Sequence, residues 1–419
     1  MAEYKDMTKQ QLLAEKEQLQ KRYEDYKAMG LSLDMSRGKP SKEQLDLSMD
    51  MLLPIDYVVD GFDVRNYGIL DGIPCCKELF AELMGVEPKN VVIGPSASLN
   101  LMFDYITQCY TEGALGSTPW CKLDSVKFLC PVPGYDRHFT ILEHYGIEMI
   151  NVAMTPDGPD MDAIEELVKD ESVKGMFCVP KYSNPQGITF SDATVERIAA
   201  LKPAAKDFRI IWDNAYCVHD LKEEGDVLLN IFDILPKYGN EDMVIEVCST
   251  AKMTFPGAGV SALTASDANI AQIKKRLNCE TISYDKMNQL RHVKFFGNVD
   301  GIKKHMKKHA DIMKPKFDMV LNHLENELGG KGIAQWLDPK GGYFISLDVM
   351  PGCAKRVGEL CKEAGVTLTT VGATYPYGND PDNSNIRIAP SLPPVAELDL
   401  ATQILCVSVQ LACIEKLVG

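Results

Sequence analysis

The sequence lacks an excess of positive charge. Its 44 lysines and arginines are outnumbered by 59 aspartates and glutamates, and the formal net charge is −15 at pH 7. Because nucleic-acid binding needs clustered cations that neutralise phosphates, this balance argues against a nucleic-acid partner. The other proportions, 45% hydrophobic and 25% charged residues, are ordinary for a soluble globular protein.

Disulfide and membrane signals are also missing. The 13 cysteines are an odd number, none has Cys-x-x-Cys spacing, and Cys75-Cys76 is the lone adjacent pair, a pattern typical of reduced cytoplasmic thiols. The first residues are charged and lack the apolar core of a secretion signal. The longest apolar stretch near the end, 404–414, is too short to span a bilayer. We therefore expect a cytoplasmic protein without membrane contact.

The length of 419 residues suits one large domain and a smaller one. We expect the chain to open with a helix that has Thr8 as its N-cap, Gln11 completing a capping box, and Gly30 as its stop. The expected parts are an N-terminal helix and arm that packs with the small domain, a large domain and a small C-terminal domain, at residues 1–50, 51–290 and 291–419.

Seven short apolar runs alternate with helical segments from about residue 91 onward. They predict an α/β fold whose large domain is built on a mainly parallel seven-stranded sheet. The runs are 91–94, 125–131, 148–154, 175–180, 209–213, 243–249 and 260–266. Ligands bind beyond the carboxyl ends of the strands in such sheets. Asp213 and Ser249 each close a run, so we expect the functional site there.

A smaller α/β unit is expected after the last of these runs. The pattern turns helical after Tyr284 and stays so to about Leu328. Strands are then expected near 343–349, 366–369 and 385–389. No internal repeat or low-complexity linker separates the two parts, so we expect them to pack closely.

Four polar signatures occur in a fixed order along the chain. They are Asn184-Pro185-Gln186-Gly187, Asp213-Asn214-Ala215-Tyr216, Ser249-Thr250-Ala251-Lys252 and Arg387 within 385–390. Together they supply what a pyridoxal phosphate (PLP) site needs, namely an acceptor for the ring nitrogen, donors to the ring oxygen, an amine that reacts with the aldehyde, and a carboxylate clamp.

At these residues the sequence resembles the fold-type I PLP-dependent aminotransferases. Within that family it is most similar to an unusual bacterial aspartate aminotransferase subclass, of the class I/II, MocR-like kind. The likeness covers nearly the whole chain and includes four further motifs, at 36–40, 65–68, 131–139 and 341–348. It implies the PLP-dependent transferase fold of type I, with a large domain, a smaller α/β domain and PLP as the cofactor.

The resemblance assigns catalytic roles to Lys252, Asp213 and Tyr216. Lys252 would react with the cofactor aldehyde and then move a proton between the substrate α-carbon and the cofactor, which needs a lowered amine pKa. Asp213 would face the pyridine nitrogen, Tyr216 and Asn184 would donate to the ring oxygen, and Tyr135 would stack on the ring. Outside the family context, each has a plainer interpretation: a surface lysine, an aspartate N-cap after a strand, an Asn-Pro turn or a core tyrosine.

Phosphate binding is expected at the start of a helix near residue 99. Ser96, Ala97 and Ser98 lie between a predicted strand and this helix, whose free N–H groups would bind an anion. The resemblance adds the Ser249 hydroxyl and Tyr67, a tyrosine that family members receive from the partner subunit of a homodimer.

The chain departs from the family beside this phosphate site. Most members carry an arginine about eight residues after the lysine, whereas Pro256-Gly257-Ala258-Gly259-Val260 supplies none. Ala251 also stands where a serine is frequent. The sequence therefore names no cation that balances the phosphate charge.

Substrate binding is expected around Arg387. The resemblance makes its planar guanidinium the clamp for the substrate α-carboxylate, assisted by Asn184 and by the backbone at Gly38. Arg37 and Lys39 are our candidates for binding a second, side-chain carboxylate.

The leading hypothesis is transamination of aspartate and 2-oxoglutarate to oxaloacetate and glutamate by ping-pong chemistry. Alternatives are an aminotransferase for alanine or aromatic amino acids, and a PLP-dependent β-eliminating lyase or decarboxylase, which the same residues permit. A more remote alternative is the effector domain of a transcription regulator. Only about thirty residues precede Ser36, too few for a winged helix-turn-helix.

Metal binding is not expected. His305 and His309 are spaced i,i+4 on a predicted helix and could hold a metal ion. The surrounding lysines suggest a solvated cationic face instead, and these are Lys303, Lys304, Lys307 and Lys308.

Overall fold

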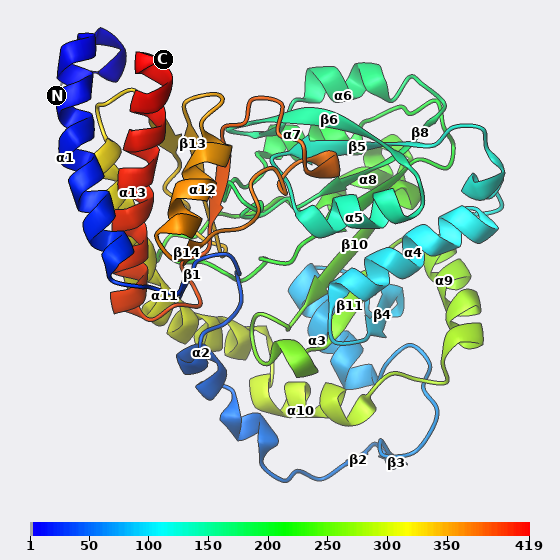
Figure 1. Ribbon diagram of the computed structural model, residues 1–419. Helices are drawn as coiled ribbons and strands as arrows, with labels where there is room; N and C mark the ends of the chain where they lie inside the picture. Colours follow the sequence, from blue (N-terminus) through cyan, green and yellow to red (C-terminus); the bar gives the residue numbers. More distant parts are fainter. Residues whose placement is uncertain (1–2) are drawn as a thin grey trace.

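An eight-stranded sheet forms the centre of the protein, which we describe over residues 3–419 from a computed structural model (Figure 1). In spatial order the strands are β4 (Val91–Gly94), β11 (Ser261–Thr264), β10 (Val244–Ser249), β9 (Arg209–Asp213), β8 (Val173–Cys178), β5 (Lys127–Val132), β6 (Glu148–Thr155) and β7 (Gly158–Pro159). The strands from β10 to β6 pair in parallel, whereas β11 is antiparallel to both neighbours and β7 to β6. The predicted fold class and all seven predicted strands are confirmed, and β7 is the addition.

The central strands are apolar without alternation because both faces of the sheet are covered. Every residue of β8, β9 and β10 is buried. On β9, Ile211 faces a cluster with α4 (Ser98–Glu112), α5 (Asp136–His144) and α9 (Asp267–Glu280), whereas Ile210 and Trp212 face one with α6 (Met161–Leu167), α7 (Asp192–Ala199) and α8 (Ile231–Tyr238). Continuous burial of this kind is characteristic of parallel sheets between two helical layers.

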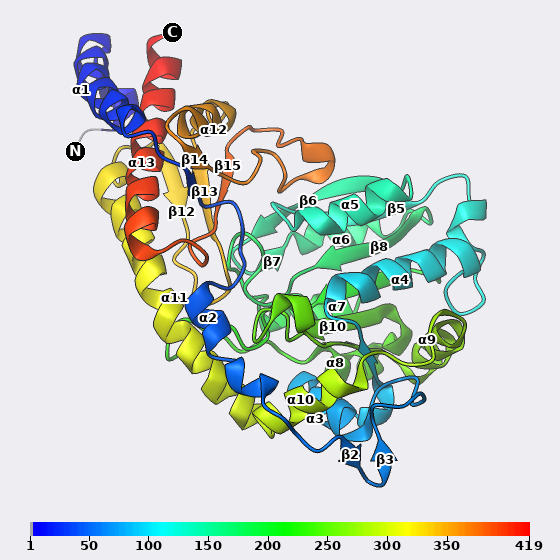
Figure 2. The same cartoon turned by 60° about the horizontal axis from the view of Figure 1, so that its bottom comes forward.

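A second group of elements packs on one side of this layer (Figure 2). Its sheet is antiparallel, in the order β12 (Ala334–Trp336), β13 (Ile345–Val349) and β15 (Asn385–Ile388). Its helices are α1 (Lys9–Ala28), α11 (Val299–Leu328), α12 (Ala354–Glu363) and α13 (Val395–Val418). The Thr8–Gln11 capping box that begins α1 is confirmed, and α1 ends just before Gly30, whose φ is +63°.

One predicted strand of this smaller unit lies outside its three-stranded sheet. The segment near 366–369 forms β14 (Val366–Thr367), which pairs in parallel with β1 (Leu33–Asp34) of the N-terminal arm and not with β13 or β15. The arm therefore enters the smaller unit as a strand before it continues to α2 (Lys42–Asp46).

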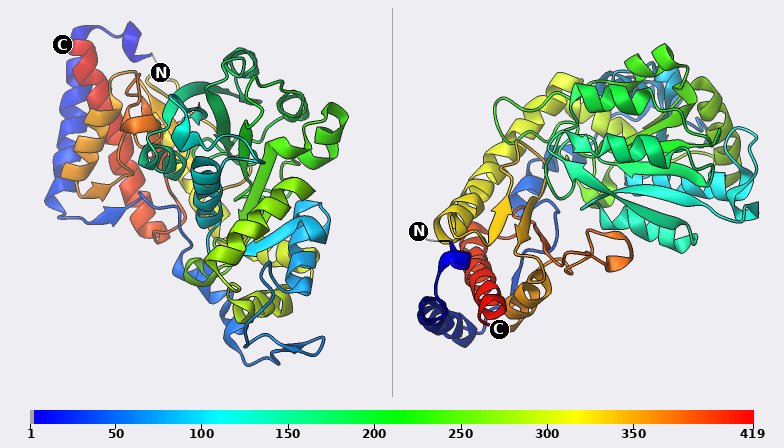
Figure 3. Two further views of the ribbon diagram at one scale, coloured as in Figure 1. Left: turned by 90° about the vertical axis from the view of Figure 1, so that its right-hand side faces the viewer. Right: turned by 90° about the horizontal axis from the view of Figure 1, so that it is seen from above.

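The long helix α11 joins the two groups of elements (Figure 3). Its first turns carry Ile302 and Met306, which pack with Leu79 of α3 (Pro74–Met84) and with Met253, whereas its later residues pack with α13. Residue 291 lies inside α10 (Lys286–Phe296). We keep the three-part division of the chain as an interpretation, and this packing favours a last boundary within α11.

The C-terminal helix is longer than its apolar run suggested. α13 has 24 residues and is, by length and composition, long and apolar enough to cross a membrane. Of its most apolar window, 78% is buried inside the protein against α1, α11 and α12. It is the central helix of the smaller unit's core.

We expect Leu405→Ala to lower the free energy of unfolding by about 2–5 kcal/mol, because a fully buried leucine leaves a cavity when truncated. Leu417→Ala on the same helix is the matched control, since Leu417 is 37% exposed. Urea unfolding of both variants measures the difference. Equal losses would mean that α13 is not a core helix.

Candidate active site

The candidate residues lie at the carboxyl edge of the large sheet. Asp213 ends β9 and Ser249 ends β10, which run in parallel, so both side chains lie at the same edge. Gly94 ends β4 and pairs with Ser261, which in turn pairs with Ser249. Lys252 follows in the loop after β10.

Asp213 is a buried carboxylate with one oxygen paired and the other free. It is 2% exposed, and Oδ2 lies 3.0 Å from Nε2 of His138. The His138 ring stacks on Phe177 with centroids 4.4 Å apart. Oδ1 is buried and has no hydrogen-bond partner among the described residues. No helix begins directly after β9, so the N-cap interpretation of Asp213 is wrong.

The free Asp213 oxygen fits a ligand that carries an N–H group. Buried carboxylate oxygens are normally hydrogen-bonded, and leaving one unpaired costs roughly 1–3 kcal/mol. A protonated pyridine nitrogen has the hydrogen that this oxygen lacks. The residues present therefore fit the cofactor that the sequence pattern predicts.

Lys252 lies next to Tyr216, with Nζ 4.9 Å from the centre of the tyrosine ring. Burial lowers the pKa of the Lys252 amine, the Asp213 carboxylate opposes this shift, and the Arg387 guanidinium adds to it. Tyr216 is buried, which raises the pKa of its hydroxyl well above its usual value. A lowered lysine pKa increases the fraction of neutral amine available for bond formation and proton transfer.

Tyr135 lies beside the His138–Asp213 pair. It occupies the position before the first residue of α5, and its ring meets the His138 ring edge to face with centroids 5.0 Å apart. Burial, together with the nearby Asp213 carboxylate, raises the pKa of Tyr135 to about 12. His138 belongs to the motif at 131–139, but nothing in the sequence tied its ring to Asp213.

Arg387 is 8% exposed and is held by several partners. Its Nη1 donates to Asp136 Oδ1 at 2.9 Å and to Asn184 Oδ1 at 3.3 Å. Its guanidinium carbon lies 4.8 Å from the centre of the Phe344 ring. The sequence did not predict the ion pair with Asp136, because the two residues are 251 positions apart.

The N-terminal arm also reaches the surroundings of Arg387. A Cβ added at Gly38 would lie 2.3 Å from Cζ of Phe344, so only glycine allows this close approach to the ring that covers Arg387. Arg37 and Lys39 are exposed. The arm therefore lies against the predicted substrate clamp, with two exposed cations beside Gly38.

The predicted phosphate elements are neighbours. Ser98 begins α4, and Ala97 is the N-cap residue, with no side-chain cap. A Cβ at Gly259 would lie 2.6 Å from the Ser96 carbonyl oxygen, which shows how closely the loop after Lys252 approaches this turn. The Ser249 hydroxyl accepts the Ala251 backbone N–H at 3.0 Å.

The position of the missing arginine is apolar. Val260 is 2% exposed, and Pro256–Ala258 form a short 3-10 helix without any charged side chain. The groups on this loop and at the start of α4 that could bind an anion are backbone N–H groups and the Ser249 hydroxyl.

Tyr67 lies on the protein surface and not among the other residues predicted to bind the phosphate. Its side chain is 77% exposed, and together with Arg65 it lines a surface cavity whose other wall is the segment 281–287. This exposure leaves the ring available to a second chain.

The expectation of a solvated face at His305 and His309 is wrong. They are 5% and 1% exposed and lie on the inner side of α11, whereas the neighbouring lysines are on its outer side. His305 Nε2 lies 2.8 Å from the Met253 carbonyl oxygen. Across residues 3–419, no group of three or more His, Cys, Asp or Glu side chains is arranged to hold a metal ion.

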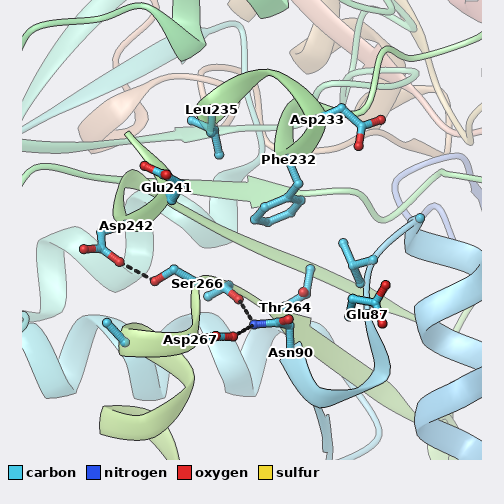
Figure 4. A pocket seen from close by; sticks show the side chains of 14 residues that line it. Glu87, Asn90, Phe232, Asp233, Leu235, Glu241, Asp242, Thr264, Ser266 and Asp267 are labelled. Carbon is cyan, nitrogen blue, oxygen red and sulfur yellow. Dashed lines mark hydrogen bonds between the residues drawn. The ribbon is translucent and has the colours of Figure 1, made fainter. Parts of the chain in front are cut away.

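A surface cavity of about 860 Å³ lies at the opposite edge of the sheet (Figure 4). It is next to Asn90, which precedes β4, and Asp242, which precedes β10. Carboxylates dominate its polar wall, including Glu87, Asp233 and Glu241. Such a lining repels a phosphate, so this cavity is not the cofactor site.

Known proteins resemble this chain over nearly its whole length. The family model described as aspartate amino-transferase matches residues 7–419. An aspartate aminotransferase of Corynebacterium glutamicum is 47% identical over 404 residues, which cover 95% of this chain and 94% of that protein. The crystal structure of an aspartate transaminase from Corynebacterium glutamicum superposes with a TM-score of 0.96 at 46% identity over 99% of each chain.

A more distant structure shares the fold. LysN, an α-aminoadipate aminotransferase of Thermus thermophilus solved with N-(5′-phosphopyridoxyl)-L-leucine, has a TM-score of 0.73 at 18% identity, covering 92% of this chain and 93% of that one. The fold and the matches together define an aminotransferase of fold type I. Within this class, the chain belongs to the aspartate aminotransferase family. Family membership implies pyridoxal phosphate as the cofactor.

A buried histidine, His292, also contacts the loop after β10, and its pKa leads to a prediction about stability and pH. The His292 Nδ1 faces the Asn288 carbonyl at 2.8 Å, and its Nε2 lies 3.0 Å from the Thr254 hydroxyl. Burial lowers the pKa of His292 to about 4, against the raising effects of that carbonyl and of the Asp285 carboxylate.

We expect His292 to make the protein less stable as the pH falls below about 6.5. The unfolded state takes up a proton there, whereas the folded state resists protonation until about pH 4, so folding stability is lost across this window. From pH 7 to pH 5 the loss is about 2 kcal/mol. Urea unfolding at both pH values should show a smaller loss for His292→Gln. If the variant loses as much unfolding free energy between pH 7 and pH 5 as the wild type does, His292 is not the group responsible.

Proposed function

We propose that this protein transfers the amino group of aspartate to 2-oxoglutarate, giving oxaloacetate and glutamate. The observation that carries the proposal is the joint position of Lys252 and Asp213. A lysine with a lowered pKa lies near a buried carboxylate whose second oxygen has no donor among the described residues, and the Arg387 guanidinium is close enough to lower that lysine pKa further. The aspartate aminotransferase names of the relatives from Corynebacterium glutamicum support aspartate as the donor.

The cofactor would be held by two sets of residues, one around its ring and one around its phosphate. Asp213 would accept from the ring nitrogen, and Tyr216 and Asn184 would donate to the ring oxygen. Tyr135 would pack on the ring face. Ser96, Ala97, Ser98 and Ser249 would bind the phosphate through the helix N-terminus and a hydroxyl.

The cofactor supplies an electron sink for the bond broken at the substrate α-carbon. Asp213 would favour the protonated form of the ring nitrogen, because a buried carboxylate stabilises a neighbouring positive charge. The Lys252 amine would hold the cofactor by reacting with its aldehyde, and as the free amine it would accept the proton from the substrate α-carbon. One lysine would thus serve as nucleophile and as general base.

Substrate orientation would come from Arg387. Its guanidinium fork suits a bidentate bond to the α-carboxylate, for which Asp136 must give up its place at Nη1. The second carboxylate of aspartate would then meet Arg37 or Lys39 on the arm. Two carboxylates bound at fixed points orient the α-C–H bond toward Lys252.

The active form would be a cytoplasmic homodimer. Tyr67 is among the most exposed large side chains of the chain, and in our proposal it contributes to the phosphate site of a second copy. The adjoining apolar Ile282, which is 60% exposed, would be covered by the same contact.

Mixing the PLP-loaded protein with aspartate and 2-oxoglutarate should produce glutamate, and Lys252→Ala should lower the rate by at least about 10⁴-fold because nucleophile and base are lost together. Glutamate release followed with a coupled assay measures this. Ammonia or CO₂ released without glutamate would indicate the lyase or decarboxylase alternative. Faster turnover of alanine or an aromatic amino acid would instead indicate another aminotransferase.

Arg37→Ala should weaken the use of dicarboxylic substrates selectively. We expect kcat/KM for aspartate to fall by roughly ten- to a hundredfold, while that for alanine stays within about twofold, because a charge-assisted hydrogen bond contributes about 1.5–3 kcal/mol. Lys39→Ala is the matched variant on the other side of Gly38. Equal losses for aspartate and alanine would refute the assignment of Arg37 to the side-chain carboxylate.

A further inference from the structure

A buried hydrogen-bond network lies behind the peptide that joins Lys252 to Met253. Its side chains come from α2, from α11 and from the segment before β13, and none is more than 5% exposed. They are Gln44, His305, His309 and Tyr343. The proposed reaction has so far assigned them no part.

The orientation of the Gln44 amide is fixed by its own helix. Its Oε1 accepts the backbone N–H of Ser41 at 3.0 Å in a capping box. Its NH₂ group is therefore free to donate to the Tyr343 hydroxyl at 3.1 Å and to His309 Nδ1 at 3.0 Å. A ring nitrogen that accepts from an amide carries no hydrogen, so the neutral His309 ring has its hydrogen on Nε2.

The two branches that leave Gln44 end on consecutive carbonyl groups. The Tyr343 hydroxyl donates to the Lys252 carbonyl at 3.2 Å. His305 Nε2 lies 2.8 Å from the Met253 carbonyl, and His309 also faces this oxygen, with its Nε2 3.1 Å from that of His305. Because a carbonyl has two lone pairs, it accepts from both imidazoles.

The network is uncharged. Burial lowers the pKa of His309 to about 3, and burial also lowers the pKa of His305 below its ordinary value. The facing groups are the Gln44 amide and the hydroxyls of Ser48 and Tyr343. Each histidine therefore holds one hydrogen at neutral pH, as the directions of the hydrogen bonds require.

The same network reaches the substrate side of the site. Gln44 follows closely after the arm residues 37–39, and Tyr343 immediately precedes Phe344, which contacts Gly38 and covers Arg387. The network therefore lies between the arm that carries Arg37 and Lys39 and the backbone of Lys252.

We propose that Gln44 is a positioning residue, which fixes the Lys252–Met253 backbone through Tyr343 and the His305–His309 pair. This inference rests on the proposed role of Lys252. A side chain that accepts and returns a proton depends on its placement to within about 1 Å, and misplacement by that distance costs up to about a hundredfold in rate. The backbone carbonyls that the network holds belong to this lysine and to the next residue.

Gln44→Met removes the two donors at nearly constant volume. We expect kcat to fall at least tenfold, with KM for aspartate changed less than twofold because Arg387 is untouched. The midpoint of the pH titration of the cofactor's absorption band, which reports on the environment of Lys252, should also shift. Gln108→Met is the matched control: Gln108 is 1% exposed, and its amide nitrogen has no hydrogen-bond partner within residues 3–419.

Tyr343→Phe removes the Lys252 branch alone and should produce a smaller change of the same kind. Combined with Gln44→Met, it should add little, because both changes interrupt one path. If Gln44→Met does not fold, Tyr343→Phe carries the same readouts. A kcat and a titration midpoint equal to those of Gln108→Met overturn the inference. If the wild-type protein shows no absorption band that depends on Lys252, the proposed function itself is wrong. The wild-type spectrum therefore separates failure of the proposed function from failure of the Gln44 inference.

Discussion

The half-satisfied carboxylate of Asp213 is the constraint on which the site depends. A carboxylate that is 2% exposed at the end of a buried strand is costly unless both oxygens find donors. His138 satisfies Oδ2 and is itself fixed by its stack on Phe177. The remaining oxygen suits a ligand with an N–H group, and Tyr135 and Lys252 are close enough for the Asp213 charge to raise their pKa values. The parallel sheet makes this arrangement possible because β9 and β10 end at the same edge.

The local features of the fold could be predicted from the sequence because they depend on short-range patterns. Strands buried on both faces give unbroken apolar runs, and the runs at β4 and β9 predicted the strand limits without error. The start of α1 followed from Thr8 and Gln11 alone. The pairing of β14 with β1 could not be predicted, since it joins segments more than three hundred residues apart and each strand has only two residues.

The sequence led to candidate site residues that lie close together in the structure, but it did not predict their contacts. The motifs pointed to Asp213, Lys252 and Arg387, yet their partners His138 and Asp136 lie 75 and 251 positions away and follow no local pattern. The histidines of α11 show a different failure. His305, Met306 and His309 share the buried face, whereas the lysines between them share the other. A helical period of 3.6 residues places the histidines and the lysines on different faces. The prediction of a solvated face gave weight to the number of lysines and overlooked this period.

The neutral state of the α11 histidines matters for the electrostatics of the lysine. A protonated imidazole behind Lys252 would add a positive charge, lower the pKa of the amine further and oppose the effect of Asp213. Burial opposes this protonation, because it lowers the pKa values of His305 and His309. It also lowers the pKa of His219, another buried histidine near Lys252, and the Lys252 charge lowers that pKa further. The charge near Lys252 is therefore left to two groups that act in opposite directions, Asp213 and Arg387. In the proposed function, a substrate carboxylate that neutralises Arg387 would shift the balance toward Asp213 and raise the affinity of Lys252 for a proton. This shift would favour the lysine as the base that removes the α-proton.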